Sequence, residues 1–133
     1  MRRELAVAST HRTELVAVTE GVRELVDGRD GSLVTVFVPH TTAGVVVQAA
    51  GPGATAVAGD LAAAFERLVD EEAEWKHIHE GDRNPWAHVR AALTATSLAI
   101  PLVDGRLVLG DHQAIFLAEF DGPRERTLQV VVR

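Results

Sequence analysis

The sequence contains no cysteine and no tyrosine, and Lys76 is its only lysine. Without cysteine, the chain cannot form a disulfide framework, a thiolate metal cage or a cysteine nucleophile. Without tyrosine, no phenol can act as a catalytic acid or base, and Schiff-base chemistry would have to use Lys76. Every apolar run is shorter than the roughly 18 residues of a membrane span. The basic start at Arg2 and Arg3 is not followed by the apolar stretch of a signal peptide, so we expect no membrane association and a cytoplasmic location.

The charge balance is acidic, with a formal net charge of −6 at pH 7. Because such a surface repels a phosphate backbone, no nucleic-acid partner is expected. Of the 133 residues, 47% are hydrophobic and 24% are charged, which is typical of one folded domain covering residues 1–133. The chain contains no P-loop, no dinucleotide-binding fingerprint and no serine-nucleophile elbow.

Hydrophobic periodicity predicts strands at both ends of the chain and helices between them. Alternating or β-branched segments predict strands over residues 3–8, 13–18, 32–38, 43–48, 97–103, 106–109, 113–120 and 127–132. Apolar residues spaced three or four apart predict helices at 19–26 and 55–69, with Thr55 as the N-cap of the second. Asn84-Pro85 is a favoured start for another helix, and Asp104-Gly105 is a hairpin turn signal. This order of elements predicts an α+β fold with a largely antiparallel sheet.

Histidine is the most informative residue type for function. His40 follows the strand predicted at 32–38, His77 lies in a polar stretch without periodicity, and His88 lies one turn into the helix that begins near Asn84. Three imidazoles from three elements could hold a metal ion and leave one position open for water or substrate. The unpaired N–H groups at the start of that helix would favour an anion. Spacing alone also fits hydrogen-bonded structural histidines, since no H-E-x-x-H motif is present.

Other polar residues near turns and strand ends have structural readings of the same kind. These residues are Thr41, Thr42, Gln113, Glu119, Arg124 and Arg126. A strand-edge charge, a turn-side surface group or a backbone partner after Pro39 would explain each of them.

Several blocks of sequence, in this order, resemble the YjbQ family. The blocks are His40-Thr41-Thr42-Ala43-Gly44, His77-x-x-Glu80-Gly81, Ala87-His88, Ser97-x-x-x-Pro101, Gly105-Arg106-Leu107-x-Leu109-Gly110, Gln113-x-Ile115 and Glu119-Phe120-Asp121-Gly122-Pro123-Arg124. The similarity runs from about residue 2 to the C-terminus. It implies a compact single α+β domain, with an antiparallel β-sandwich-like sheet and two or three helices, that assembles as a homotrimer.

The family is named for a secondary thiamine-phosphate synthase activity, so the resemblance also implies a site. His40, His77 and His88 would hold a divalent metal ion, zinc or, with a diphosphate substrate, magnesium. Glu119 and Gln113 would be catalytic. The phosphate-binding residues would be Thr41, Thr42, Asp82, Asn84 and Arg124. The implied reaction joins an aminopyrimidine methyl diphosphate to a thiazole phosphate and releases pyrophosphate, which makes the chain a transferase for a small phosphorylated substrate.

Two departures from the family pattern bear on this expectation. Ala49 stands where the family has a carboxylate, and His112 stands where it has a tryptophan. Two alternative functions therefore stand beside the expected transferase activity. One is a metal-dependent phosphate-ester hydrolase, because a metal ion held by three histidines can also activate water. The other is a non-catalytic trimeric module that binds an anion or metabolite, which the missing acid favours.

Overall fold

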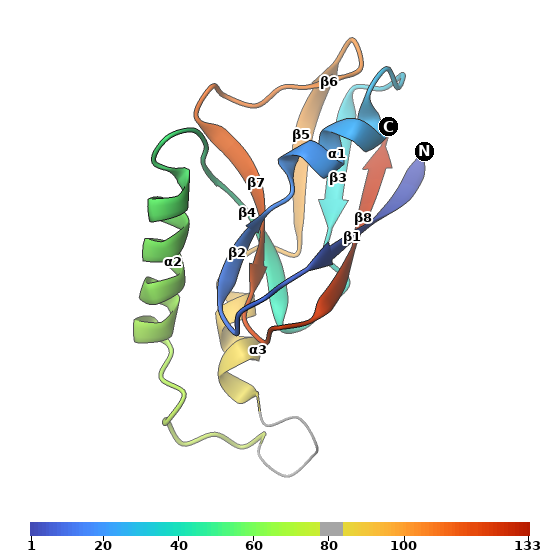
Figure 1. The fold of residues 1–133 in the computed structure, drawn as a ribbon. Coiled ribbons are helices and arrows are strands. Elements are labelled where there is room, and N and C mark those ends of the chain that lie inside the picture. Colours follow the sequence, from blue (N-terminus) through green and yellow to red (C-terminus); the bar gives the residue numbers. More distant parts are fainter. Residues whose placement is uncertain (78–83) are drawn as a thin grey trace.

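The strands of the protein form two antiparallel sheets, as expected from the sequence (Figure 1). The structure is a computed structural model and describes residues 1–77 and 84–133. The larger sheet has the order β1 (Arg2–Ala8), β8 (Glu125–Val132), β3 (Leu33–Phe37), β5 (Ser97–Val103) and β6 (Arg106–Leu107). The smaller sheet has the order β2 (Glu14–Ala17), β7 (Gln113–Glu119) and β4 (Ala43–Ala49).

The core lies between the two sheets and consists mainly of β-branched and leucine side chains. In β3, Val34 and Val36 are fully buried, whereas Leu33 and Phe37 on the opposite face are exposed. Each inward valine contributes about 1.5–3 kcal/mol by leaving water. The facing sheets supply Leu128, Val130, Ile100, Val45, Ile115 and Leu117 to the same cluster.

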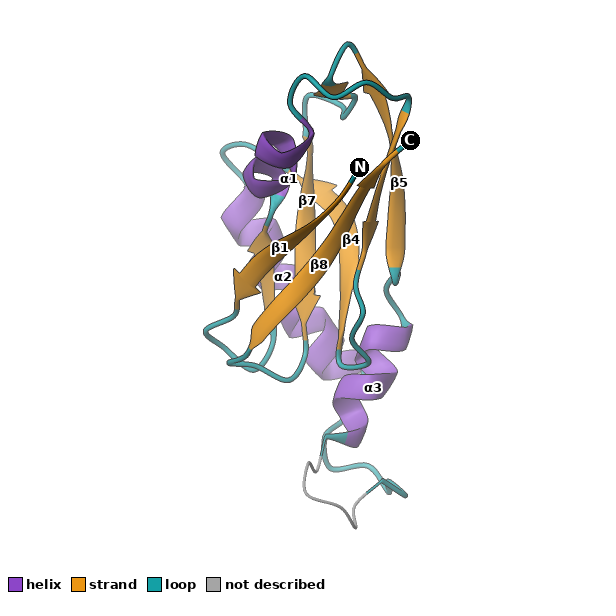
Figure 2. Cartoon of the chain, turned by 90° about the vertical axis from the view of Figure 1, so that its right-hand side faces the viewer, coloured by secondary structure: helices purple, strands orange, loops and turns teal. Residues whose placement is uncertain are grey.

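Two helices close the ends of the sandwich (Figure 2). Helix α1 (Thr19–Val26) buries Val22 and Val26 in the core at one end. Helix α3 (Pro85–Ala92) lies at the other end, where Ala87 packs with Phe120. Helix α2 (Ala54–Leu68) runs along the outer face of the smaller sheet, and none of its 15 residues is fully buried. No helix among the described residues is both long and apolar enough to cross a membrane.

Most predicted elements form, and the differences have local causes. The Asp104-Gly105 turn has positive φ at both residues, 49° and 71°, as a tight hairpin requires. The strand after this turn ends at Leu107 rather than Leu109, although the Val108 N–H still donates to the Pro101 carbonyl oxygen at 2.9 Å. Thr55 was wrongly predicted as the N-cap of α2. Gly53 holds that position, and no side chain caps the helix.

Candidate functional site

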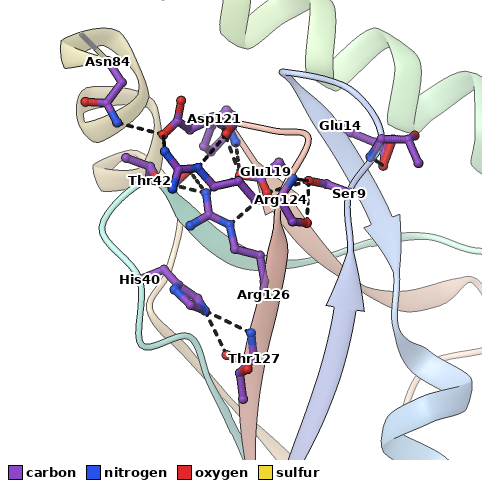
Figure 3. A network of polar contacts seen from close by, with 12 residues as sticks. Ser9, Glu14, His40, Thr42, Asn84, Glu119, Asp121, Arg124, Arg126 and Thr127 are labelled. Carbon is purple, nitrogen blue, oxygen red and sulfur yellow. Dashed lines mark hydrogen bonds and ion pairs between the residues drawn. The ribbon is translucent and has the colours of Figure 1, made fainter. Parts of the chain in front are cut away.

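A buried ion pair joins the two sheets at the α3 end of the sandwich (Figure 3). Glu119, the last residue of β7, accepts a hydrogen bond from Arg126 Nε on β8 at 2.8 Å. Arg126 Nη2 also donates to Thr42 Oγ1 at 2.8 Å. Ser9 Oγ, just after β1, donates to Glu119 Oε1 at 2.7 Å. One carboxylate therefore ties together segments that are distant in the sequence.

The Glu119 carboxylate is ionised, and both of its oxygens accept hydrogen bonds. Burial alone would raise its pKa, but the hydrogen bonds from Arg126 and Ser9 outweigh burial and hold the pKa below its ordinary value. The backbone N–H groups of Phe120 and Asp121 donate to its second oxygen, each at 3.1 Å. Glu119 does not line the neighbouring cavity, so its placement gives no support to the expected catalytic role.

A cavity of about 910 Å³ lies beside this ion pair and brings together most of the residues expected at the site. Its walls include His40, Thr41, Thr42, His77, Asn84, His88 and Arg124. They come from the segment after β3, from the chain before α3, from α3 itself and from the turn before β8. Asp82, also expected here, lies outside the described residues.

The His77 and His88 rings lie edge to face against one another on the wall of this cavity. Their ring centroids are 5.2 Å apart, with an angle of 70° between the ring planes. Among residues 1–77 and 84–133, no three His, Cys, Asp or Glu side chains form a cluster that could hold a metal ion. His40, His77 and His88 therefore share a cavity without forming a metal centre from the described part of the chain.

The side chain of His40 makes the hydrogen bonds to β8 where the backbone pairing of β3 has ended. The last paired position of β3 is Phe37, opposite Gln129, and Pro39 cannot donate a further ladder hydrogen bond. The His40 ring instead reaches Thr127, and its Nε2 lies 3.1 Å from both the N–H and the carbonyl oxygen of that residue. Burial and the nearby Arg126 charge lower the pKa of His40, so the ring is neutral at pH 7.

Asp121 binds two other residues of the cavity wall, Asn84 and Arg124. Its Oδ2 accepts hydrogen bonds from Asn84 Nδ2 and Arg124 Nη2, both at 2.8 Å. Asn84 is the N-cap residue of α3, as expected, but its side chain bonds Asp121 instead of capping the helix. Asn84 Oδ1 is buried and accepts no hydrogen bond from the described residues. A buried acceptor of this kind is costly unless a ligand supplies the donor.

Gln113 was expected at the same site, and the structure does not bring it there. It starts β7, whereas Glu119 ends this strand, and it lines a separate cavity of about 450 Å³ between α1 and α2. Its Oε1 accepts the Gly110 N–H at 2.9 Å.

The interpretation of Arg126 as a surface group beside a turn was wrong, because Arg126 is buried, and sequence reasoning assigned no role to Asp121. A signal for Arg126 was present, because it falls on the inward-facing positions of β8 with Leu128, Val130 and Val132. A cation at such a position needs a buried counter-ion. Asp121 has no comparable signal, because it lies in a turn.

Comparisons with known proteins agree on one family. The family model described as "UPF0047 protein YjbQ-like" matches residues 3–133. A UPF0047 protein from Archaeoglobus fulgidus is 37% identical over 127 residues, covering 96% of this chain and 97% of that protein. The crystal structure of a hypothetical protein from Aeropyrum pernix K1 has a TM-score of 0.90 and 34% identity, covering 100% of this chain and 98% of that one.

These relatives overturn the expected activity. A similar crystal structure from Sulfolobus solfataricus, with a TM-score of 0.89, 30% identity and coverage of 98% and 94%, is titled a YbjQ-like protein of unknown function. Nothing in the comparisons supports thiamine-phosphate synthase-like transfer, metal-dependent hydrolysis or a trimeric anion-binding module, and the expected function is corrected accordingly. The family match extends over nearly the whole chain, and the solved relatives share its fold. The chain therefore belongs to the UPF0047, YjbQ-like family.

Proposed function

We propose that this chain is an acid–base enzyme that binds a small phosphorylated substrate and exchanges a proton with it through His77 and His88. The observation that carries the proposal is the pair of imidazoles 5.2 Å apart on the wall of one cavity. Imidazole can donate and accept protons near neutral pH, so one ring can remove a proton while the other supplies one.

The charged side chains beside the cavity are paired with one another. Arg126 is paired with Glu119, and Arg124 with Asp121, so carboxylates hold both guanidinium groups in place. A guanidinium group fixed in this way presents N–H donors in a geometry that matches phosphate oxygens.

Arg124 and His40 support the phosphate part of the proposal from two sides. Asp121 orients the Arg124 guanidinium through its carboxylate and through its carbonyl oxygen, 3.0 Å from Arg124 Nε. When His40 Nε2 accepts the Thr127 N–H, the proton of the neutral ring is on Nδ1, where it can be donated to a phosphate oxygen.

The proposed enzyme is a cytoplasmic homotrimer, as the family resemblance implies. Leu33 and Phe37 lie on the outward face of β3 and are 38% and 41% exposed, which favours a covered sheet face. The divalent metal ion expected from the sequence, zinc or magnesium, stays a prediction. Elemental analysis of protein purified without a metal-affinity tag tests it.

Binding is tested first, with inorganic phosphate as the probe and 31P NMR as the readout. The variants are His88→Gln and, as a matched control, His112→Gln, since His112 is exposed and does not line the cavity. We expect saturable binding to wild type and the control, and about tenfold weaker binding to His88→Gln, for the loss of one charge-assisted hydrogen bond. Equal binding by all three proteins, or none, would contradict the proposal. The titration is repeated in EDTA to reveal any contribution of metal.

Proton transfer is tested separately in D2O. Small phosphorylated compounds with acidic C–H groups are incubated with the protein and followed by 1H NMR. We expect deuterium to enter at least one of them with wild type and His112→Gln but not with His77→Gln or His88→Gln. Binding without exchange in the whole panel would reduce the proposal to a binding protein.

A further inference from the structure

A second cavity, of about 600 Å³, adjoins the first and shares two residues with it. His77 and His88 line both spaces. On the far side of the two rings, the apolar wall is made by Trp75, Pro85 and Val89, and the exposed residues Glu74 and Lys76 complete the lining. The histidine pair thus stands between a polar cavity and one with a largely apolar wall.

Contacts behind the Trp75 ring hold it in place. Its Nε1 donates to the Glu71 carbonyl oxygen at 3.2 Å. Glu71 is in turn bonded to Arg12 at 2.8 Å, and buried Arg90 donates to the carbonyl oxygen of Val69 at 2.8 Å. The segment that carries Trp75 is therefore anchored both to α3 and to the loop before β2. A wall that is formed in advance loses little entropy when a ligand packs against it.

An apolar wall beside polar groups is the usual composition of a small-molecule site, in which apolar contact gives affinity and a few polar groups fix the orientation. Pro85 and Val89 share one face of α3 with His88, because residues three or four apart in a helix are neighbours. A ligand whose anionic end reaches Arg124 could therefore place its other end against Trp75, with its central atoms beside the two imidazoles.

We infer that the substrate is a phosphate monoester whose organic group is flat and apolar, and that Trp75 selects this group. This inference rests on the proposed function, because it assumes that phosphate binds in the larger cavity. It adds the chemical class of the organic group, which lies in the smaller cavity. Trp75, Pro85 and Val89 offer no hydrogen-bond acceptor to the hydroxyl groups of a sugar phosphate or another polyol phosphate, and the charged lining residues Glu74 and Lys76 are exposed.

Tryptophan fluorescence provides a direct test, because the chain has two tryptophans and no tyrosine. Trp86→Phe leaves Trp75 as the only tryptophan. This variant is titrated with phenyl phosphate, glycerol 3-phosphate and inorganic phosphate. We expect phenyl phosphate to change the Trp75 emission and to bind at least tenfold more tightly than the other two.

Two further variants separate selection by Trp75 from a loss of structure. With 31P NMR as the readout, Trp75→Ala should reduce the affinity for phenyl phosphate to that for glycerol 3-phosphate while leaving inorganic phosphate binding within about twofold. Trp75→Phe should keep most of the preference for phenyl phosphate. Leu68→Ala, which removes an apolar side chain that is 74% exposed and lines neither cavity, should change nothing.

The outcomes distinguish a failure of this inference from a failure of the proposed function. Equal affinity for phenyl phosphate and glycerol 3-phosphate, with inorganic phosphate still bound, would overturn the inference and leave the proposed function intact. A preference for phenyl phosphate that survives in Trp75→Ala would also overturn it. Failure of all three probes to bind would instead refute the phosphate site.

Discussion

Glu119 and Arg126 form an ion pair from which water is excluded, so removal of one partner would leave the other charged and buried. We expect Glu119→Gln to lower the free energy of unfolding by about 3–5 kcal/mol. Urea denaturation measures this loss. Glu14→Gln is the matched control, because Glu14 pairs with the exposed ring of His11, and the expected loss there is about 1 kcal/mol or less. Equal losses in both variants would show that burial does not strengthen the inner pair.

The lowered pKa values of His40 and Glu119 predict how the stability of the protein depends on pH. The pKa of His40 is lowered in the folded protein, so below about pH 6.5 the unfolded chain takes up a proton that the folded chain resists. The pKa of Glu119 is also lowered, so its contribution is complete above about pH 4.3 and is lost as the pH falls toward its folded value. Urea titrations at several pH values should therefore show stability falling in two stages on acidification. His40→Gln should remove the first stage, and its persistence would contradict the assignment to His40.

At the scale of the elements, β4 depends on a glycine where it passes the end of α3. A methyl group at Gly44 would lie 1.8 Å from Thr94 Oγ1 and 2.9 Å from the Ala95 carbonyl oxygen. We expect Gly44→Ala to destabilise the protein by about 1–3 kcal/mol in urea denaturation. Gly59→Ala, in α2 with no atom within 4 Å of the added group, should stabilise it by about 0.5–1 kcal/mol. The prediction is wrong if the two substitutions act in the same direction.

Helix α2 and strand β7 differ in how firmly the fold holds them. Residues of α2 such as Ala58 and Leu61 are only partly buried against Phe116, whereas Ile115 and Leu117 of β7 are fully buried. Local opening requires less free energy where few apolar contacts are broken. Hydrogen exchange followed by mass spectrometry should show the amides of α2 exchanging well before those of β7. Matching exchange rates would mean that α2 opens only with the whole domain.

The elements also show how far periodicity alone could predict this structure. The alternation in β3 and β8 depends on which face meets the core, so pattern and structure agree there. Helix starts depend on contacts with other segments. Asn84 bonds Asp121, 37 residues away, instead of the backbone N–H groups of α3, and no local pattern contains that partner. The separation of Gln113 from Glu119, in contrast, is local, because the two residues are the opposite ends of one strand, which the pattern already predicts over 113–120.

At the scale of the whole molecule, the outward face of the larger sheet predicts self-association. Leu33 pairs with Pro101 in β5, and Phe37 is exposed on the same face of β3. We expect Leu33→Lys combined with Phe37→Lys to convert the proposed trimer to monomers, measured by light scattering after size-exclusion chromatography. Arg67→Ala, on the exposed side of α2, is the control and should leave the mass unchanged. A monomeric wild type would refute the proposed assembly.

The ion pair between β7 and β8 holds the two sheets together at the end where the larger cavity lies. Thr42 and Asp121 belong both to this junction and to the cavity wall, so a molecule seated there would stiffen the junction itself. Occupancy should therefore raise the melting temperature of the whole domain. At a concentration one hundred times its Kd, a ligand that binds only the folded chain adds about 2.7 kcal/mol of stability. Thermal-shift screening of a metabolite library can then find the natural ligand without any assay of its chemistry.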